Sequence, residues 1–245
     1  MKITVFTSNS LRHVYLIKQL SKISRRIYVF QEKRPLLEGK KNSIYKKSLL
    51  IEKYFKRVGI AEKKIFRDVS RNISIKNLKI LTLNFGELNS LNYKKYKSFF
   101  NSDIYIIFGS SFIKGSLCEF LIRKKAINIH MGVTPYYKGA DCNFWALYDD
   151  NPGYVGGTIQ LLSRKLDSGK TICIAKPKYN NDPFIFTMSS TKDVILKLKN
   201  LIKLKKISKI KPVKINEKKL IRHSKRKEFT EKAIKIFLKK FKIKI

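Results

Sequence analysis

The chain has 245 residues, of which 43% are hydrophobic and 12% aromatic, enough to bury the core of one sizeable domain with a small appendage. The first ten residues lack the long apolar core of a signal peptide, and no run is long enough to cross a bilayer, so the expected compartment is the cytoplasm. The three cysteines form no C-x-x-C pair and have no adjacent histidine cluster, which argues against a zinc site and a disulfide framework.

Basic residues outnumber acidic ones by 55 to 17, which gives a formal net charge of +38. Residues 101–180 contain 10 Lys or Arg against 6 Asp or Glu, whereas residues 192–245 contain 21 against 4. Lysine also outnumbers arginine, which is the more usual reader of bases. We therefore favour lysines on solvated faces over a nucleic-acid interface, and polyanion binding stays open as the lesser alternative.

The opening segment predicts a strand, a helix and a second strand. KITVFTS is an apolar run rich in β-branched residues, LRHVYLIKQLSK carries apolar residues at near-helical spacing, and RIYVF resumes a strand. This is the βαβ opening of a doubly wound sheet. The first turn reads T-S-N-S-L-R and lacks G-x-G-x-x-G, so a dinucleotide cofactor is not expected.

A Lys-rich, helical stretch is expected over residues 35–66, and strands and helices continue to alternate beyond it. ILTLNF, DIYIIFGS and AINIHM are typical of strands, and NYKKYKSFF and GSLCEFLIRK of helices. This alternation implies a mainly parallel sheet, whose ligands gather beyond the carboxyl ends of the strands. The predicted fold class is α/β, with a mainly parallel, doubly wound, Rossmann-like sheet.

The character of the chain changes after residue 183. Residues 194–202 and 233–241 carry apolar stripes at helical spacing with lysines opposite. Between them, KISKIKPVKINEKK alternates apolar and basic residues, as a short edge strand or hairpin does. These helices are expected to dock on the main domain, although a basic amphipathic helix can also lie on an anionic membrane.

From these patterns we predict two parts. Residues 1–190 form the main domain, with the Lys-rich segment 35–66 as an insertion, and residues 191–245 form a helical or mixed extension.

Polar side chains stand out near the end of the AINIHM strand. Asn128 and His130 are two residues apart, so they emerge on the same face of the strand. Downstream, VGGTIQLLSRKLDSGKTICI predicts strand, turn and strand, with Asp167 in the turn. Each residue has a structural alternative: a satisfied amide, a histidine held by backbone partners, and a turn aspartate that bonds its own backbone. Their order, with P-x-x-x-G-A and a segment containing Trp145 between them, is a stronger signal.

This arrangement resembles the formyltransferase family that uses 10-formyltetrahydrofolate, including glycinamide ribonucleotide, methionyl-tRNA and sugar N-formyltransferases. The resemblance is most specific over residues 127–171 and extends more loosely over residues 1–190. It implies that the protein is a one-carbon transferase with Asn128, His130 and Asp167 as its catalytic centre. Other positions that match the family pattern are Pro135, Gly139, Ala140 and Thr158 to Gln160.

The resemblance also implies 10-formyltetrahydrofolate as co-substrate, with no metal. Expected folate contacts are Ser110, Ser111, Phe112, Ile113, Gly139 and Leu166, and candidate contacts for the acceptor are Arg12, His13, Tyr136 and Lys138. Structural alternatives stay open: Ser110 and Ser111 as a capped strand-to-helix turn, Phe112 as a core residue, and Arg12 with His13 as a surface pair at a helix start.

The sequence around the expected catalytic residues suggests which class of molecule accepts the formyl group. M-G-V-T-P follows His130, where many purine and tRNA formyltransferases have S-L-L-P, and the short Lys-rich chain after Phe184 argues against the C-terminal β-barrel of a methionyl-tRNA enzyme. The segment N-I-H-M-G-V-T-P-Y-Y-K-G-A-D-C-N-F-W-A-L, with D-P-F-x-F-T-M at 182–188, is most similar to formyltransferase-like proteins of surface-polysaccharide pathways.

The expected function is therefore transfer of a formyl group to the amine of a nucleotide-linked amino sugar, as in lipopolysaccharide biosynthesis. The alternatives are a methionyl-tRNA or glycinamide ribonucleotide formyltransferase and, from another class, a non-catalytic nucleic-acid or anionic-surface binding protein. A nucleic-acid partner is not expected, and a homodimer is compatible with this interpretation.

Overall fold

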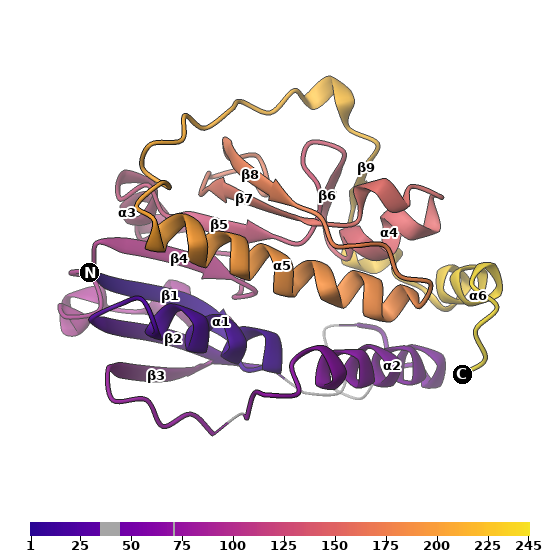
Figure 1. Ribbon diagram of the computed structural model, residues 1–245, viewed down its shortest axis with the longest axis horizontal. Helices are drawn as coiled ribbons and strands as arrows, with labels where there is room; N and C mark the ends of the chain where they lie inside the picture. Colours follow the sequence, from indigo (N-terminus) through magenta and orange to yellow (C-terminus); the bar gives the residue numbers. More distant parts are fainter. Residues whose placement is uncertain (35–44, 71) are drawn as a thin grey trace.

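In the computed structural model, which describes residues 1–34, 45–70 and 72–245, seven strands form one sheet in the order β3-β2-β1-β4-β5-β7-β8 (Figure 1). The strands from β3 to β5 are parallel, whereas β7 runs antiparallel to β5 and β8 antiparallel to β7. The mainly parallel, doubly wound α/β fold predicted from the sequence is confirmed. The bounds are β1 Lys2–Ser8, β2 Arg26–Lys33, β3 Leu78–Asn84, β4 Ile104–Phe108, β5 Ile127–His130, β7 Gly157–Leu161 and β8 Thr171–Ala175.

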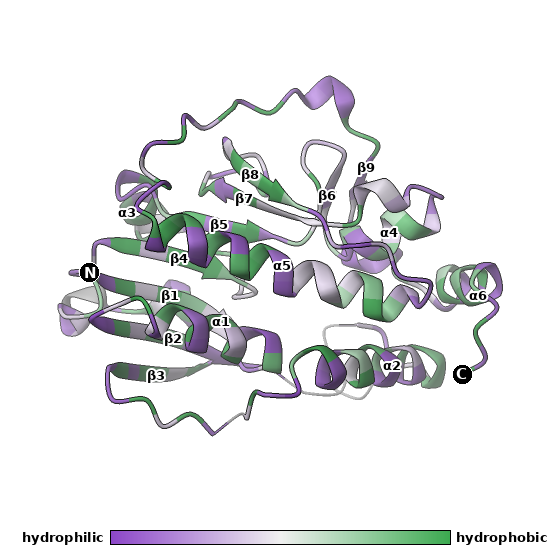
Figure 2. Ribbon diagram, in the orientation of Figure 1, coloured by the Kyte–Doolittle hydropathy of each residue, from purple (hydrophilic) through white to green (hydrophobic). Residues whose placement is uncertain are grey.

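Helices cover both faces of the sheet, as parallel strands require. α1 (Leu11–Ser21) and α5 (Pro183–Lys203) pack on one face, and α3 (Gly115–Arg123) packs on the other. Side chains alternate along β1, so Val5 joins the first core and Phe6 the second. Figure 2 shows the result: the strands are largely hydrophobic, whereas the helices carry hydrophilic residues on part of their surface.

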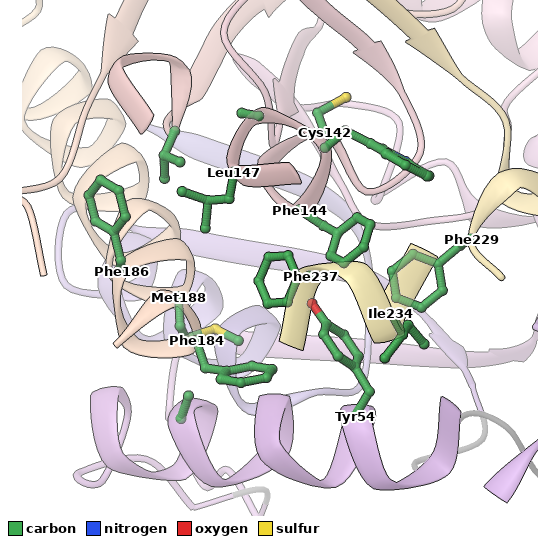
Figure 3. Packing of buried hydrophobic residues seen from close by; sticks show 14 of the residues in the cluster. Tyr54, Cys142, Phe144, Leu147, Phe184, Phe186, Met188, Phe229, Ile234 and Phe237 are labelled. Carbon is green, nitrogen blue, oxygen red and sulfur yellow. The ribbon is translucent and has the colours of Figure 1, made fainter. Parts of the chain in front are cut away.

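A third apolar cluster lies beyond the sheet, among α2 (Leu49–Ile65), α4 (Cys142–Tyr148), α5 and α6 (Glu231–Lys240). Tyr54 of α2 projects into it, with ring centroids 5.2 Å from Phe184 and 5.3 Å from Phe229 (Figure 3). Phe237 of α6 stacks on Phe144 of α4 at 4.7 Å. This aromatic cluster holds the C-terminal helix against the rest of the fold.

The C-terminal segment also contributes a strand. β9 (Arg222–Ser224) pairs in parallel with β6 (Tyr137–Gly139). Between α5 and β9 the chain runs along the outside of the sheet past β8 (Figure 1). α5 continues through residue 190, so the division of the chain at that point stays a prediction, and residues 35–44 of the predicted insertion lie outside the described residues.

Two predicted elements differ from the structure. NYKKYKSFF forms only a 3₁₀ turn at Tyr93–Tyr96, because Phe99 and Phe100 turn inward against Phe30. KISKIKPVKINEKK forms one isolated bridge, between Val213 and Thr171, instead of a hairpin. Proline at position 212 lacks the N–H that a longer ladder would use.

The predicted apolar stripe of α6 is buried rather than available to a membrane surface: Ala233, Ile234, Phe237 and Leu238 all lie in the third cluster. Within the described ranges, each helix is either too short or too polar to cross a bilayer.

Candidate active site

A cleft of about 520 Å³ lies beyond the carboxyl ends of β4 and β5. β1 sits between β2 and β4, so the strand order reverses there, and open α/β sheets bind ligands at such a switch point. The predicted site residues that line the cleft are Arg12, His13, Ser110, Ser111, Phe112, Ile113, Asn128, His130, Gly139, Leu166 and Asp167.

His130 ends β5 and forms an ion pair with Asp167, with 3.1 Å between Nδ1 and Oδ1. β7 runs antiparallel and ends opposite Ile127, so the loop after β7 returns along β5 to bring the carboxylate to the imidazole. Asp167 adopts a left-handed φ of 48°, which few residues other than glycine do. Both side chains are only 6% exposed, so the pair is held apart from bulk water.

Gly139 fixes the second oxygen of Asp167. Its backbone N–H donates to Oδ2 of the carboxylate at 3.0 Å. Gly139 has a φ of 92°, and a Cβ atom there would lie 2.1 Å from the carbonyl oxygen of Ser224 in β9. Only glycine fits between the Asp167 loop and the C-terminal strand, so β9 supports the site from behind.

The ion pair sets the charge of both groups. Burial lowers the pKa of His130, but the Asp167 carboxylate and the neighbouring Cys142 outweigh it, so the pKa ends well above its ordinary value. Burial raises the pKa of Asp167, but His130 and the Gly139 N–H outweigh it, and the net shift is downward. An imidazolium beside a carboxylate is therefore the stable state near neutral pH.

Asn128 lines the cleft on the same strand face as His130 and is half-buried. Its side-chain amide makes no hydrogen bond to any described residue, so it is available to a ligand. Gln160 of β7 lies directly opposite it in the sheet. The Gln160 side chain is 1% exposed and its Oε1 has no hydrogen-bond partner among the described residues, an acceptor that the sequence analysis matched to the family pattern without giving it a role.

The loop after β4 is held by a buried acid that the sequence analysis missed. Glu32 is fully buried and accepts hydrogen bonds from the N–H and hydroxyl of Ser111 and from the N–H of Gly86. The sequence did offer one signal: Glu32 lies near the carboxyl end of an apolar strand. An acidic residue that is buried there needs hydrogen-bond partners, which the loops at that edge of the sheet can supply. Phe112 is 55% exposed, so the core alternative is wrong for this residue, whereas Ile113 is buried in the core.

Arg12 and His13 begin α1 and differ in environment. Arg12 bonds Glu62 of α2 through its backbone N–H and its guanidinium, both at 3.0 Å. His13 is 3% exposed and lies edge-on to Phe108, so the surface-pair alternative is wrong for it. Burial, followed by the charge of Arg12, lowers the pKa of His13 well below its ordinary value, which leaves a neutral imidazole in the cleft wall.

Tyr136 and Lys138 do not line the cleft. Tyr136 stacks on Tyr154 with 4.2 Å between ring centroids. Lys138 is 3% exposed and bonds Glu217 at 2.5 Å and Ser168 at 3.2 Å. Its ammonium group therefore ties the Asp167 loop to the C-terminal segment, and the geometry gives no support to a direct contact with substrate.

The cleft is positively charged. Arg12, Arg34, Lys165 and Arg226 line it, although Arg12 is paired with Glu62. Such a lining favours anionic ligands. Among the described residues, no group of three or more His, Cys, Asp or Glu side chains could hold a metal ion.

No model of a known protein family matches the sequence, and no curated protein matches it either. Solved structures do. A sugar N-formyltransferase from a Shewanella species has a TM-score of 0.57 and 12% identity, over 97% of this chain and 86% of that chain. The N-formyltransferase from Helicobacter canadensis, solved with folinic acid and dTDP-3-aminofucose, has a TM-score of 0.56 and 14% identity, over 98% of this chain and 81% of that one.

Phosphoribosylglycinamide formyltransferase from Anaplasma phagocytophilum matches with a TM-score of 0.53 and 17% identity, over 86% of this chain and 88% of that chain. At these identities the comparisons establish the fold that this chain shares with formyltransferases. The function rests on the site itself.

Proposed function

We propose that the protein belongs to the 10-formyltetrahydrofolate-dependent formyltransferases and transfers a formyl group to the amine of a nucleotide-linked amino sugar in surface-polysaccharide biosynthesis. The observation that carries the proposal is the buried His130–Asp167 ion pair, which lies with Asn128 in one cleft at the switch point of this fold. The resemblance found in the sequence assigned catalysis to these three residues, and they come from segments up to 39 residues apart in the chain.

The residue types suit the reaction. The neutral amine attacks the formyl carbon, a carbon–nitrogen bond forms, and negative charge develops on the formyl oxygen. The Asn128 side-chain amide donates a hydrogen bond to that oxygen. The charged His130 imidazole donates a second through its Nε2–H, which otherwise donates to the backbone carbonyl of Tyr137 at 3.1 Å. Donors held in place in a water-poor site each contribute about 3 kcal/mol to the stability of such a transition state.

Proton transfer completes the step. The attacking nitrogen loses a proton and the leaving folate nitrogen, N10, gains one as the bond between the formyl carbon and N10 breaks. Asp167 keeps His130 charged and can orient a water that relays this proton. The products are the formamide and tetrahydrofolate, with no net gain or loss of protons or electrons.

The cleft accounts for both substrates of this proposal. The folate fits along residues 109–113 and 160–167, where Glu32 holds the loop backbone in place. The sugar N-formyltransferases among the structural neighbours support an amino-sugar acceptor, and the arginines of the cleft suit a nucleotide diphosphate. The homodimer and the cytoplasmic location inferred from the sequence stay predictions.

The test is a panel assay read by mass spectrometry. The protein is incubated with 10-formyltetrahydrofolate and, in separate reactions, dTDP-3-aminofucose, a UDP-linked 4-amino sugar and glycinamide ribonucleotide. We expect one sugar nucleotide to gain a single formyl group with wild-type protein, no detectable gain with His130→Ala, and a gain about 100-fold slower or more with Asp167→Asn. Formylation of glycinamide ribonucleotide alone would move the assignment to that acceptor, and transfer to none of the three would overturn the proposal.

A further inference from the structure

A second cavity adjoins the cleft and extends away from it on the side of α2. It measures about 340 Å³ and lies among α2, α4 and α5. His130, Gly139 and Asp141 line both spaces, so the two meet at the catalytic histidine. A molecule bound in this cavity would therefore meet a ligand bound in the cleft next to His130.

One face of α2 forms a wall of this cavity. Phe55, Val58, Gly59 and Glu62 all line it, at positions i, i+3, i+4 and i+7, the spacing of one helical face. Glu62 is occupied by its bonds to Arg12. Phe55 and Val58 therefore form one part of this wall and Glu62 another. Gly59, which has no side chain, leaves a gap between the two parts.

The fold gives no reason for glycine at position 59. A Cβ atom there would meet no heavy atom within 4 Å, and its φ is not in the left-handed region. Glycine in the middle of a helix weakens it relative to alanine. What glycine does provide is the volume that a side chain would fill. Because Gly59 lies on the face of α2 that lines the cavity, this volume is part of the cavity.

We propose that Gly59 is a specificity-determining residue: it leaves room for the part of the acceptor next to the reacting amine. The inference deepens the proposed function and rests on it. The rest of the lining includes Tyr54, Phe144 and Met188, which suit a compact ring with an apolar face. The cavity takes the ring, and the diphosphate of the nucleotide extends toward the arginines that line both spaces, Arg12 and Arg34.

The test compares Gly59→Leu and Gly59→Ala with wild type, using the sugar nucleotide of the panel that wild type formylates fastest. Leucine is expected to raise the KM for that acceptor about tenfold or more, the discrimination that added methylenes produce in a closed pocket, and alanine to raise it less. The KM for 10-formyltetrahydrofolate stays within about twofold, and the melting temperature is equal or higher, because both residues favour the helix more than glycine does.

Ile60→Phe is the matched control, since it adds bulk to the same helix at a 59% exposed position outside the cavity and leaves both KM values unchanged. An unchanged acceptor KM in Gly59→Leu, with wild-type transfer intact, overturns this inference and leaves the proposed function standing. The absence of transfer by wild-type protein overturns both. If leucine prevents folding, Gly59→Ala carries the comparison alone.

Discussion

Asn128, His130 and Asp167 differ in how firmly the protein holds them. Asp167 is fixed at both carboxylate oxygens, by His130 and by the Gly139 N–H, whereas the side chain of Asn128 has no hydrogen-bond partner among the described residues. That contrast fits their proposed roles. Asp167 holds the positive charge on His130, and the Asn128 side chain donates a hydrogen bond to an oxygen of the ligand. It also means that removal of Asp167 acts on His130 before it acts on substrate.

The first prediction concerns Asp167→Asn and the pH profile. Burial then dominates at His130 and its pKa falls. The alkaline limb of kcat, which we expect above pH 6.5 in wild type because the pKa of His130 is raised, should therefore move to lower pH. At neutral pH kcat falls about 100-fold or more, the size of a general acid–base contribution. Rates measured across pH test this, with Asp150→Asn, which removes only an exposed ion pair to Lys240, as control. An unshifted alkaline limb contradicts the role given to Asp167.

The same pair makes a contribution to stability whose pH window can be derived. His130 has a raised pKa, so its share is complete below 6.5 and is lost as pH rises through the raised value. Asp167 has a lowered pKa, so its share is complete above 3.8 and is lost as pH falls through the lowered value. The stability difference between wild type and Asp167→Asn, measured by denaturant unfolding, should therefore be largest between 3.8 and 6.5.

A further prediction concerns Glu32→Gln. Glutamine offers one acceptor oxygen where Glu32 receives three hydrogen bonds, so the loop at Ser111 loosens. We expect the KM for 10-formyltetrahydrofolate to rise about tenfold, which corresponds to the loss of about one charged hydrogen bond, with a smaller change in kcat. Glu87→Gln, which changes an exposed acid, is the control. A loss of kcat without a change in KM would place Glu32 elsewhere in the reaction.

At the scale of elements, the sequence predicts those helices and strands whose apolar residues recur with a regular period. The apolar runs became β1, β2, β4 and β5, and the stripe at 194–202 became part of α5. The strand face shared by Asn128 and His130 also followed from the two-residue period. The segments that pack against one another in three dimensions were harder to predict. The pairing of β9 with β6 joins residues more than 80 positions apart, and the R-H-S sequence of β9 has no pattern that indicates a strand.

The same limit applies to the site. Asn128, His130 and Asp167 were predicted because their order along the chain resembles a family pattern, and all three line one cleft. Glu32 and the cavity beside Gly59 were not, because each depends on which helix or loop packs against which strand end. Lys138 was assigned to substrate on sequence alone, whereas its burial and its bond to Glu217 became visible only in the folded chain.

The attachment of α6 gives a prediction at this scale. Phe237 is 1% exposed and packs on Tyr54, Phe144 and Phe184, so Phe237→Ala should lower the free energy of unfolding by about 3 to 5 kcal/mol. Ile236→Ala, at a 39% exposed position on the same helix, should cost about 1 kcal/mol or less. Denaturant unfolding of the two variants measures this, and equal losses would mean that α6 is not docked as described.

For the whole molecule, the net charge of +38 and the proposed catalytic centre lead to separate predictions. Non-specific binding to duplex DNA should weaken steeply between about 50 and 200 mM salt, because it depends on counterion release. The kcat of formyl transfer should change by about twofold or less over the same range, because the His130–Asp167 pair is buried and little screened. Salt-sensitive DNA binding that persists in His130→Ala, together with no formyl transfer by wild-type protein, would favour the nucleic-acid alternative.

The most direct test follows the formyl carbon itself. Tetrahydrofolate carrying a ¹³C-labelled formyl group at N10 is mixed with the amino-sugar nucleotide, and the ¹³C NMR spectrum is recorded over time with wild type and with His130→Ala. With wild type only, the label should leave the folate and appear as a formamide on the sugar nitrogen. A label that stays on the folate with wild-type protein, or that moves equally fast with His130→Ala, would contradict this prediction.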